Sequence, residues 1–198
     1  PHGDLNAHIT DLAMHLVGEI DSVVGMTETF IKERPLAEAV DASLGAKGGG
    51  PKKKGKVTVE DACLFMARFK NGALGSFEST RFAKGRRNHN RFEINGSKGS
   101  IVFNLEKMNE LQYFSDDDGG HVQGFREIIV GEGEHPYMSA WWPPGHIIGW
   151  EHTFTHEFRD FFEARRVVTP LGEYRAGGID QLLPASVRLI CGDQRTGK

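Results

Sequence analysis

The sequence contains little cysteine, and this shortage excludes one class of protein. Its two cysteines, Cys63 and Cys191, lie far apart in sequence, each within an apolar segment. Such a pair favours buried thiols in a reducing compartment over a disulfide framework of the kind that small secreted domains use. We therefore expect a cytoplasmic protein.

The sequence also has neither a large net charge nor long apolar runs. The 24 Lys and Arg residues nearly balance the 27 Asp and Glu residues, and the formal net charge is -3. We therefore expect neither a nucleic-acid partner nor attraction to an anionic membrane surface. Charged residues interrupt the apolar stretches, and the chain does not begin with a basic region followed by an apolar run. Neither a membrane-spanning helix nor a signal peptide is predicted.

What is present is an ordinary composition for a folded domain. The chain has 198 residues, of which 38% are hydrophobic and 26% are charged, enough for one well-filled core. We therefore expect a single domain over residues 1–198. The chain opens at Pro1 with neither an initiator Met nor a strand ahead of the first helical pattern. This opening is typical of a fragment excised from a longer protein.

Hydrophobic periodicity predicts a helix and then a strand in the first part of the chain. Apolar residues recur at the spacing of an amphipathic helix from Leu5 to Val17, and Gly18 is expected to end it. The β-branched stretch from Ile20 to Ile31 predicts a strand. The range 44–56, rich in glycine and lysine, has no apolar anchor and predicts a flexible surface loop. Its lysines favour a solvated loop over a nucleic-acid contact, because no aromatic residues stand nearby.

After this loop the apolar period changes to two, which predicts a series of strands. An Asn-Gly turn at 71–72 and a glycine-bearing turn at 95–99 each separate two alternating runs, as in β-hairpins. Consecutive hairpins make a mostly antiparallel sheet. The predicted strands are Cys63–Phe69, Leu74–Phe82, Asn90–Ile94, Ser100–Phe103, Glu110–Phe114 and Phe125–Val130.

Two more helices are predicted towards the end of the chain. One runs from Trp150 to Arg165, with its phenylalanines on one side, and another lies near Ile179–Cys191, with a kink or break at Pro184. Helices before and after a run of strands predict the α+β class, with an open, mostly antiparallel sheet and helices packed on one face. The other sheet face is then free to meet a partner.

The first predicted helix carries the best candidate site. Asp4, His8, Asp11 and His15 fall at i, i+4, i+7 and i+11, so one helical face presents two carboxylates interleaved with two imidazoles. A histidine flanked by carboxylates has its ring oriented and its proton affinity raised, which suits a general base that takes a proton from an alcohol. By spacing alone, the solvated polar face of an ordinary amphipathic helix is the more favoured interpretation.

The sequence also resembles the C-terminal domain of the Gfo/Idh/MocA family of oxidoreductases. In that family an Asp, three residues, a His, two residues and an Asp lead a helix that ends in Gly, as Asp4, His8, Asp11 and Gly18 do here. The order and spacing of the segments make the resemblance fairly specific, and it extends over nearly the whole chain. The segments that carry it are Gly3–Leu12, Leu16–Ile20, Ser22–Phe30, Phe69–Gly75, Phe92–Ile101 and Phe154–Phe161.

This resemblance implies a fold and a role. It implies an α+β domain like the C-terminal domain of glyceraldehyde-3-phosphate dehydrogenase, whose sheet binds substrate on one side of a cleft and makes homodimer or homotetramer contacts on its open face. His8 would match the family's catalytic histidine, which takes the hydroxyl proton while hydride leaves the same carbon for NAD or NADP. Asp4 would bind a substrate hydroxyl or support that step. Asn6 departs from the pattern, since many relatives carry Gly at that position.

The parts of the family that bind the nucleotide are not expected in this chain. The family's catalytic Lys, usually in a Glu-Lys-Pro motif, and its glycine-rich loop belong to an N-terminal Rossmann domain. Gly48-Gly49-Gly50 does not replace that loop, because it lacks the G-x-G-x-x-G spacing between a strand and a helix. The missing Rossmann domain is therefore an expected partner.

Other residues are candidates for the substrate pocket. The connection between the two hairpins holds Arg81 and Arg86, which could bind hydroxyls, a carboxylate or a phosphate, although a solvent-facing loop is equally favoured. Asp11, His152 and His156 are further candidates for substrate binding. A zinc site formed by His146, His152 and His156 is disfavoured, because the order of residues differs from H-E-x-x-H and the family usually needs no metal. The tryptophans Trp141, Trp142 and Trp150 are expected to pack or to contact a subunit.

Two functions remain open at this point. The first is the substrate-binding half of an NAD(P)-dependent dehydrogenase acting on a sugar, polyol or cyclitol, in which case the fragment alone is expected to be inactive. The second is a non-catalytic dimerisation or sugar-binding module that retains the same fold.

Overall fold

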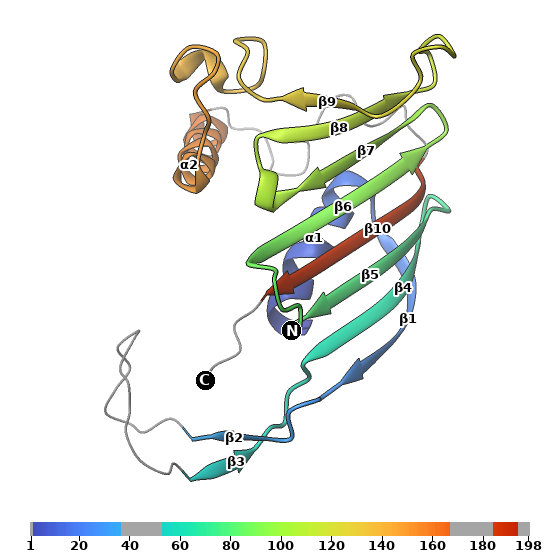
Figure 1. Ribbon diagram of the computed structural model, residues 1–198, viewed down its shortest axis with the longest axis vertical. Coiled ribbons are helices and arrows are strands. Elements are labelled where there is room, and N and C mark those ends of the chain that lie inside the picture. Colours follow the sequence, from blue (N-terminus) through green and yellow to red (C-terminus); the bar gives the residue numbers. More distant parts are fainter. Residues whose placement is uncertain (1, 37–52, 167–183, 194–198) are drawn as a thin grey trace.

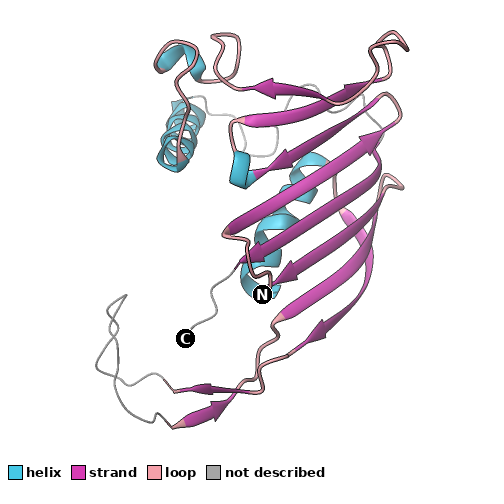
Figure 2. Cartoon of the chain, in the orientation of Figure 1, coloured by secondary structure: helices cyan, strands magenta, loops and turns pink. Residues whose placement is uncertain are grey.

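A computed structural model describes residues 2–36, 53–166 and 184–193 of the chain. Its central feature is an eight-stranded sheet in the order β1-β4-β5-β10-β6-β7-β8-β9 (Figures 1 and 2). All neighbouring pairs are antiparallel except β10 and β5, which are parallel. The predicted α+β fold with a mostly antiparallel sheet is confirmed. The strands are β1 (Ile20–Glu28), β4 (Ala62–Phe69), β5 (Leu74–Thr80), β6 (Asn88–Gly96), β7 (Gly99–Asn104), β8 (Glu110–Ser115), β9 (Arg126–Ile129) and β10 (Pro184–Asp193).

The predicted first helix is present and covers one face of this sheet. It consists of one π-helical turn, η1 (His2–Asn6), followed directly by α1 (Ala7–Leu16). The apolar stripe points inward, since Leu5, Ile9, Ala13 and Val17 are all buried. Gly18 follows with φ +128°, a value that glycine adopts without strain. Burial of this stripe is what fixes the opposite, polar face of the helix at the surface.

The core lies between this helix and the inward side of the central strands. Phe69, with 1% exposure, and Phe77 pack against the helix stripe together with Phe92 and Ile94. The rings of Phe65 and Phe77 stack with centroids 4.3 Å apart. Alternate residues of each strand supply this layer, as the period of two predicts.

The two predicted hairpins form with their expected turns. β4 pairs with β5 around the Asn-Gly turn, where Gly72 has φ +92° and Arg68 lies opposite Leu74. β6 pairs with β7, and Asn95 lies opposite Ser100. These turns were predictable because their conformations depend on local residues.

The predicted last helix is wrong in its described part. Ile179–Leu183 lies outside the described residues, but Pro184–Asp193 is strand β10, inserted between β5 and β6. Val187, Leu189 and Cys191 alternate along it in sequence, a strand period that the helix prediction overlooked. Pro184 is the first residue of the strand, where a missing N–H is tolerated.

A second, two-stranded sheet extends from the end of β1. It consists of β2 (Glu33–Pro35) and β3 (Lys54–Lys56), paired antiparallel. The prediction of a loop over 44–56 is therefore wrong for its last three residues, because backbone pairing with β2 replaces an apolar anchor. Residues 44–52 lie outside the described ranges. Asp61 anchors this sheet: its carboxylate accepts from the Ile31 backbone at 2.8 Å and from Arg34 at 3.2 Å.

The second predicted helix, α2 (Trp150–Arg166), lies beside the β8–β9 end of the sheet (Figure 1). The segment 131–149 attaches it, and Asn109 clamps the end of that segment through two hydrogen bonds with the Ile148 backbone, at 2.9 and 3.0 Å. Tyr137 has φ +68° and donates to Asp160 of α2 at 2.5 Å. None of the helices in the described ranges combines the length and apolar character that crossing a membrane requires.

Candidate active site at the start of the first helix

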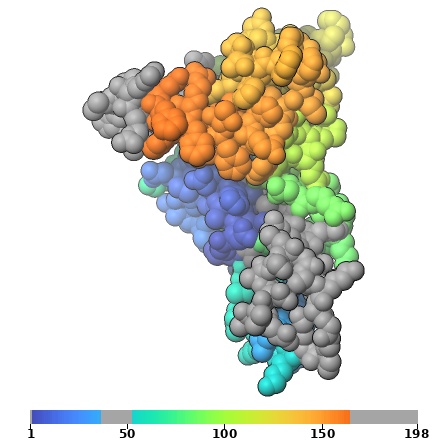
Figure 3. All heavy atoms as spheres, turned by 90° about the vertical axis from the view of Figure 1, so that its left-hand side faces the viewer, coloured from blue at the N-terminus to red at the C-terminus, as the bar shows by residue number. Residues whose placement is uncertain are grey.

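Asp4 and His8 lie one turn apart where η1 passes into α1. The distance from His8 Nε2 to Asp4 Oδ1 is 4.0 Å, and the two side chains are 71% and 58% exposed. The pair therefore faces outward from the helix, opposite the buried stripe. Figure 3 shows the blue residues of η1 and α1 on this side of the molecule, below the orange residues of α2. A π-helical turn at this point is notable, since such turns often occur at functional sites.

Arg81 completes this group from the other side. Its guanidinium donates to Asp4 Oδ2, and its side chain is only 21% exposed. Its backbone N–H donates to the Asp61 carbonyl at 2.9 Å, which fixes the residue at the end of β5. The structure thus brings together three predicted site residues, Asp4, His8 and Arg81, from two distant parts of the sequence.

Asp11 and His15 continue the same helical face but stay apart from this group. Both are exposed, and within the described part of the chain neither forms a hydrogen bond or ion pair with Asp4 or His8. The predicted row of four residues is therefore present on one face, and among the described contacts Asp4 ties it to the end of β5 through Arg81.

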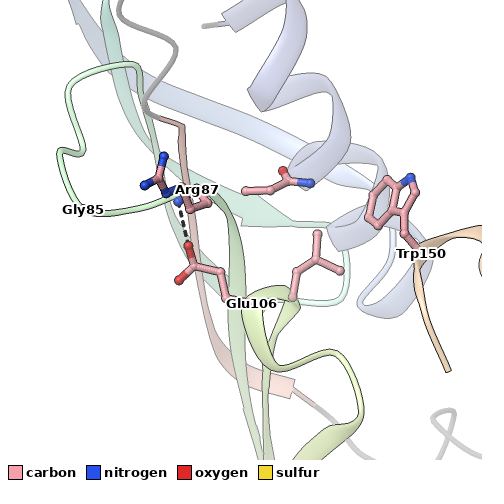
Figure 4. A pocket seen from close by; sticks show the side chains of 6 residues that line it. Gly85, Arg87, Glu106 and Trp150 are labelled. Atoms are coloured by element: carbon pink, nitrogen blue, oxygen red, sulfur yellow. Dashed lines mark hydrogen bonds between the residues drawn. The ribbon is translucent and has the colours of Figure 1, made fainter. Parts of the chain in front are cut away.

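A hollow of about 630 Å³ opens beside the connection between β5 and β6. Arg87 and Glu106 lie on one side of it and Trp150 lies on the other (Figure 4). We call it the Arg87–Trp150 hollow. Its lining residues are Gly85, Arg87, Asn88, Leu105, Glu106 and Trp150.

Glu106 holds the wall of this hollow in place. Its Oε1 accepts from the Arg87 backbone at 2.8 Å, and its Oε2 accepts from Arg86 Nη1 at 3.1 Å. The bond from the Arg87 backbone, and then that from Arg86, lower the pKa of the Glu106 carboxyl below its usual value. Arg86, predicted to bind substrate, is therefore engaged by Glu106 and contributes to the wall.

His89 lies behind the same wall. It is 5% exposed, and its Nδ1 is 3.4 Å from Glu106 Oε2. Burial, and after it the nearby charge of Arg86, lowers the pKa of this imidazole, although Glu106 acts in the opposite direction. His89 is thus a buried, mainly neutral group near neutral pH.

His152 and His156 are engaged by the segment that precedes α2. His152 Nδ1 accepts from the Gly149 backbone at 3.0 Å, and His156 Nε2 accepts from Trp141 Nε1 at 2.7 Å. The His156 ring also stacks on Tyr137, with centroids 4.3 Å apart. Burial, and then the neighbouring His152, lowers the pKa of His156. Among the described contacts, neither histidine touches Asp4, His8 or Arg81.

No metal centre is formed by the described residues: no three His, Cys, Asp or Glu side chains in those ranges are grouped so that they could hold an ion. His146, the third residue of the disfavoured zinc site, has its Nδ1 2.8 Å from the carbonyl oxygen of Pro143.

Sheet register relates the position of the hollow to that of Arg81, the partner of Asp4. Thr80 of β5 and His89 of β6 both lie opposite Gly192 of β10. Two steps of strand spacing put Thr80 and His89 roughly 10 Å apart. Arg81, which binds Asp4, follows Thr80, and Arg87 of the hollow comes shortly before His89, so the two features lie at opposite ends of one short connection.

The sequence alone did not identify Glu106 or the hollow. A weak signal exists, because Asn104 accepts from the Glu106 backbone at 3.1 Å and so caps a short 3-10 helix, η2 (Leu105–Lys107). Asn is a common N-cap residue in any helix, so the signal is not specific for a site.

Comparison with known proteins matches the first half of this chain to a family. The model of the GFO/IDH/MocA C-terminal domain matches residues 1–102. This chain belongs to that family. The match includes Asp4, His8 and Arg81.

Relatives within the family share more of the chain. Levoglucosan dehydrogenase of Pseudarthrobacter phenanthrenivorans is 45% identical over 163 residues, which are 82% of this chain and 42% of that protein. The crystal structure of an oxidoreductase domain protein from Kribbella flavida is 49% identical with a TM-score of 0.73, covering 82% of this chain and 41% of that one. A levoglucosan dehydrogenase in complex with NADH and levoglucosan is 42% identical with a TM-score of 0.70, and the match covers 82% of this chain and 40% of that one. The chain thus spans about two fifths of the length of these relatives.

Proposed function

We propose that this chain is the substrate-binding half of an NAD(P)-dependent oxidoreductase that acts on a CH–OH group of a sugar, polyol or cyclitol. The observation that carries this proposal is the pairing of His8 with Asp4 on the exposed face of the first helix, with Arg81 holding Asp4. The family relatives named as levoglucosan dehydrogenase support a sugar as substrate and NAD as cofactor.

His8 and Asp4 are spaced to receive two neighbouring hydroxyls. Their nearest atoms are 4.0 Å apart, too far for a hydrogen bond between them. One hydroxyl can therefore donate to His8 Nε2 while the adjacent hydroxyl donates to Asp4 Oδ1. His8 then takes the proton of the hydroxyl that is oxidised, and the Asp4 carboxylate stabilises the imidazolium that forms.

The remaining predicted residues have supporting roles in this proposal. Arg81 orients Asp4, and Arg86 acts through Glu106 on the wall of the hollow. His152 and His156 contribute by fixing the segment that leads into Trp150 and α2. Asp11 stays exposed on the same helical face, where it can accept a bond from a substrate hydroxyl further from the reacting carbon.

The described residues fit the substrate-binding half of an enzyme whose cofactor is held by another domain. They contain no strand, glycine-rich turn and helix in the order that binds a dinucleotide, whereas the proposed base lies on an open surface. When bound, the nicotinamide supplies the hydride acceptor. We propose that a Rossmann domain holds it against the face that carries His8.

We also propose a homodimer or homotetramer that assembles through the open face of the sheet. Val24 lies opposite Met66, and Met26 lies opposite Leu64, so these side chains share one face. They are 45% to 72% exposed, an apolar patch of the kind that marks protein contacts. The buried free thiol of Cys63 supports a cytoplasmic location.

Replacing the proposed base in the full-length enzyme tests the function. His8→Ala should lower turnover with NAD and a sugar by about 100-fold or more, with little loss of nucleotide affinity. His15→Ala is the matched control, since His15 lies on the same helix face and should leave turnover unchanged. Near-normal turnover of His8→Ala would reject the assignment.

The alternative is a non-catalytic dimerisation or sugar-binding module. The exposed apolar sheet face favours it as much as it favours an enzyme. Light scattering combined with calorimetry against a panel of sugars and polyols discriminates between the two. A stable dimer without sugar binding favours the scaffold, and sugar binding that depends on Asp4 or His8 favours the enzyme.

A further inference from the structure

We infer that the Arg87–Trp150 hollow binds a second ring of the substrate, so that the enzyme acts on glycosides or disaccharides in preference to single sugars. This inference rests on the proposed function, because it places the first ring at His8 and Asp4. It adds a binding site and narrows the substrate class.

The walls of the hollow have the chemistry that recognises a sugar ring. Trp150 is 47% exposed and meets Phe154 edge to face, with ring centroids 5.9 Å apart. This contact holds the indole while leaving much of its surface open. A flat aromatic surface packs against the C–H face of a pyranose, and Leu105 extends the apolar part of the hollow.

Polar groups on the opposite side remain available for hydroxyls. Within the described part of the chain, the side chains of Arg87 and Asn88 form no hydrogen bond or ion pair, although both line the hollow. Glu106 is already occupied by the Arg87 backbone and by Arg86. The guanidinium and amide are therefore the groups that a ligand would meet, and both bind hydroxyl oxygens.

The placement of the hollow sets the size of the ligand. Thr80 and His89, on the two strands that flank β10, are roughly 10 Å apart by strand spacing. Arg81 next to Thr80 reaches Asp4, and Arg87 near His89 lines the hollow. A ligand that occupies both features must extend along this connection, and two linked pyranose rings match the strand spacing between Thr80 and His89. The volume of about 630 Å³ accommodates a second ring.

Steady-state kinetics of the full-length enzyme with one-ring and two-ring sugars test this inference. The probes are D-glucose with cellobiose and maltose, and D-galactose with lactose. The wild-type enzyme should show a higher kcat/KM for two-ring sugars. Trp150→Ala should lower kcat/KM for two-ring sugars by about tenfold, through loss of about 1.4 kcal/mol of binding free energy. The same variant should change kcat/KM for single sugars by less than about twofold. Arg87→Met should act in the same direction, and Trp150→Phe should restore part of the loss.

Two matched controls separate the hollow from general effects. Trp142→Ala removes a tryptophan that is 74% exposed and does not line the hollow. Lys84→Met removes a neighbouring exposed cation of the same connection. Both should leave the ratio of kcat/KM values unchanged. An equal loss for one-ring and two-ring sugars in Trp150→Ala, or a wild-type preference for single sugars, overturns the inference while leaving the proposed function intact.

Failure of the proposed function gives a different result. If the wild-type protein oxidises none of these sugars and none of a panel of polyols and cyclitols, the proposed function fails, and titration calorimetry with cellobiose and maltose then decides about the hollow. Binding that Trp150→Ala abolishes and Trp142→Ala preserves supports a second-ring site. No binding to the wild-type protein overturns it.

Discussion

The guanidinium of Arg81 donates a hydrogen bond to the carboxylate of Asp4, although the two residues are 77 positions apart in sequence. Arg81 stands at the end of β5, and Asp4 lies in the π-helical turn that precedes α1. The sheet therefore determines where the Asp4 carboxylate lies relative to His8. The orientation of the proposed base therefore depends on a residue at the end of a strand that is distant from it in sequence.

Arg81 is accordingly expected to act on catalysis through Asp4. Arg81→Met in the full-length enzyme should lower kcat/KM by about tenfold to 100-fold, because Asp4 loses the partner that positions it. Arg81→Lys should recover part of the activity, since the charge remains and the planar fork is lost. Arg68→Met, an exposed arginine of β4, is the control. Unchanged kinetics in Arg81→Met, measured with NAD and a sugar, would contradict this role.

Glu106 is expected to stabilise the connection between β5 and β6. Glu106→Ala removes the acceptor of the Arg87 backbone N–H and the partner of Arg86, and should cost about 1–2 kcal/mol of unfolding free energy. Glu106→Gln keeps an acceptor and should cost less. Chemical denaturation followed by circular dichroism measures both, with the exposed Glu132→Ala as control. Equal stability of Glu106→Ala and wild type would show that the wall does not need this carboxylate.

The parts of the fold that follow from local residues were predictable from the sequence. The helix stripe beginning at Leu5 and the turn at Gly72 depend on periodicity and turn chemistry within a few residues. Strand β10 was not predictable in this way. Its pairing partners at Leu74 and Asn95 are about 90 to 110 positions away, and a short apolar run is compatible with helix or strand until such partners are known.

The candidate site likewise contains some contacts that the sequence predicts and others that it does not. Asp4 and His8 lie one helical turn apart, so their proximity follows from helix geometry. Arg81 was recognised as a candidate, but its contact with Asp4 depends on how β5 ends against η1. The role of Glu106 depends on two backbone segments that meet only in the folded sheet. Sequence patterns name residue types, whereas these contacts require the tertiary structure.

Burial of His89 predicts that stability falls as the solution becomes acidic. Its pKa in the folded protein is below the ordinary value of 6.5, chiefly because of burial. The unfolded chain therefore binds a proton at His89 more readily, so the stability that neutral His89 provides is complete above pH 6.5 and is lost as the pH falls through the folded pKa. The loss is at most about 1.4 kcal/mol per pH unit for one proton.

Unfolding free energies measured between pH 7.5 and pH 5.5 check this expectation. Glu106 does not titrate in that window, because its pKa lies below its ordinary value of 4.5. His89→Gln should flatten the pH dependence relative to wild type, and His15→Gln, an exposed residue, should leave it unchanged. The same slope in all three proteins would exclude His89 as the titrating group.

Asp61 is expected to be worth more to stability than its single ion pair suggests. Its side chain is 5% exposed and accepts from the Ile31 backbone as well as from Arg34, whose side chain is 34% exposed. Asp61→Ala leaves two donors without an acceptor and should cost about 3 kcal/mol, whereas Arg34→Met leaves the Ile31 bond in place and should cost about 1 kcal/mol. The double variant should cost less than the sum, because removing the carboxylate already ends the interaction with Arg34. Denaturation of the four proteins of this cycle measures the coupling. Strict additivity would mean that the ion pair between Arg34 and Asp61 contributes nothing to holding β2 and β3, and that the backbone bond to Ile31 accounts for the effect of Asp61→Ala.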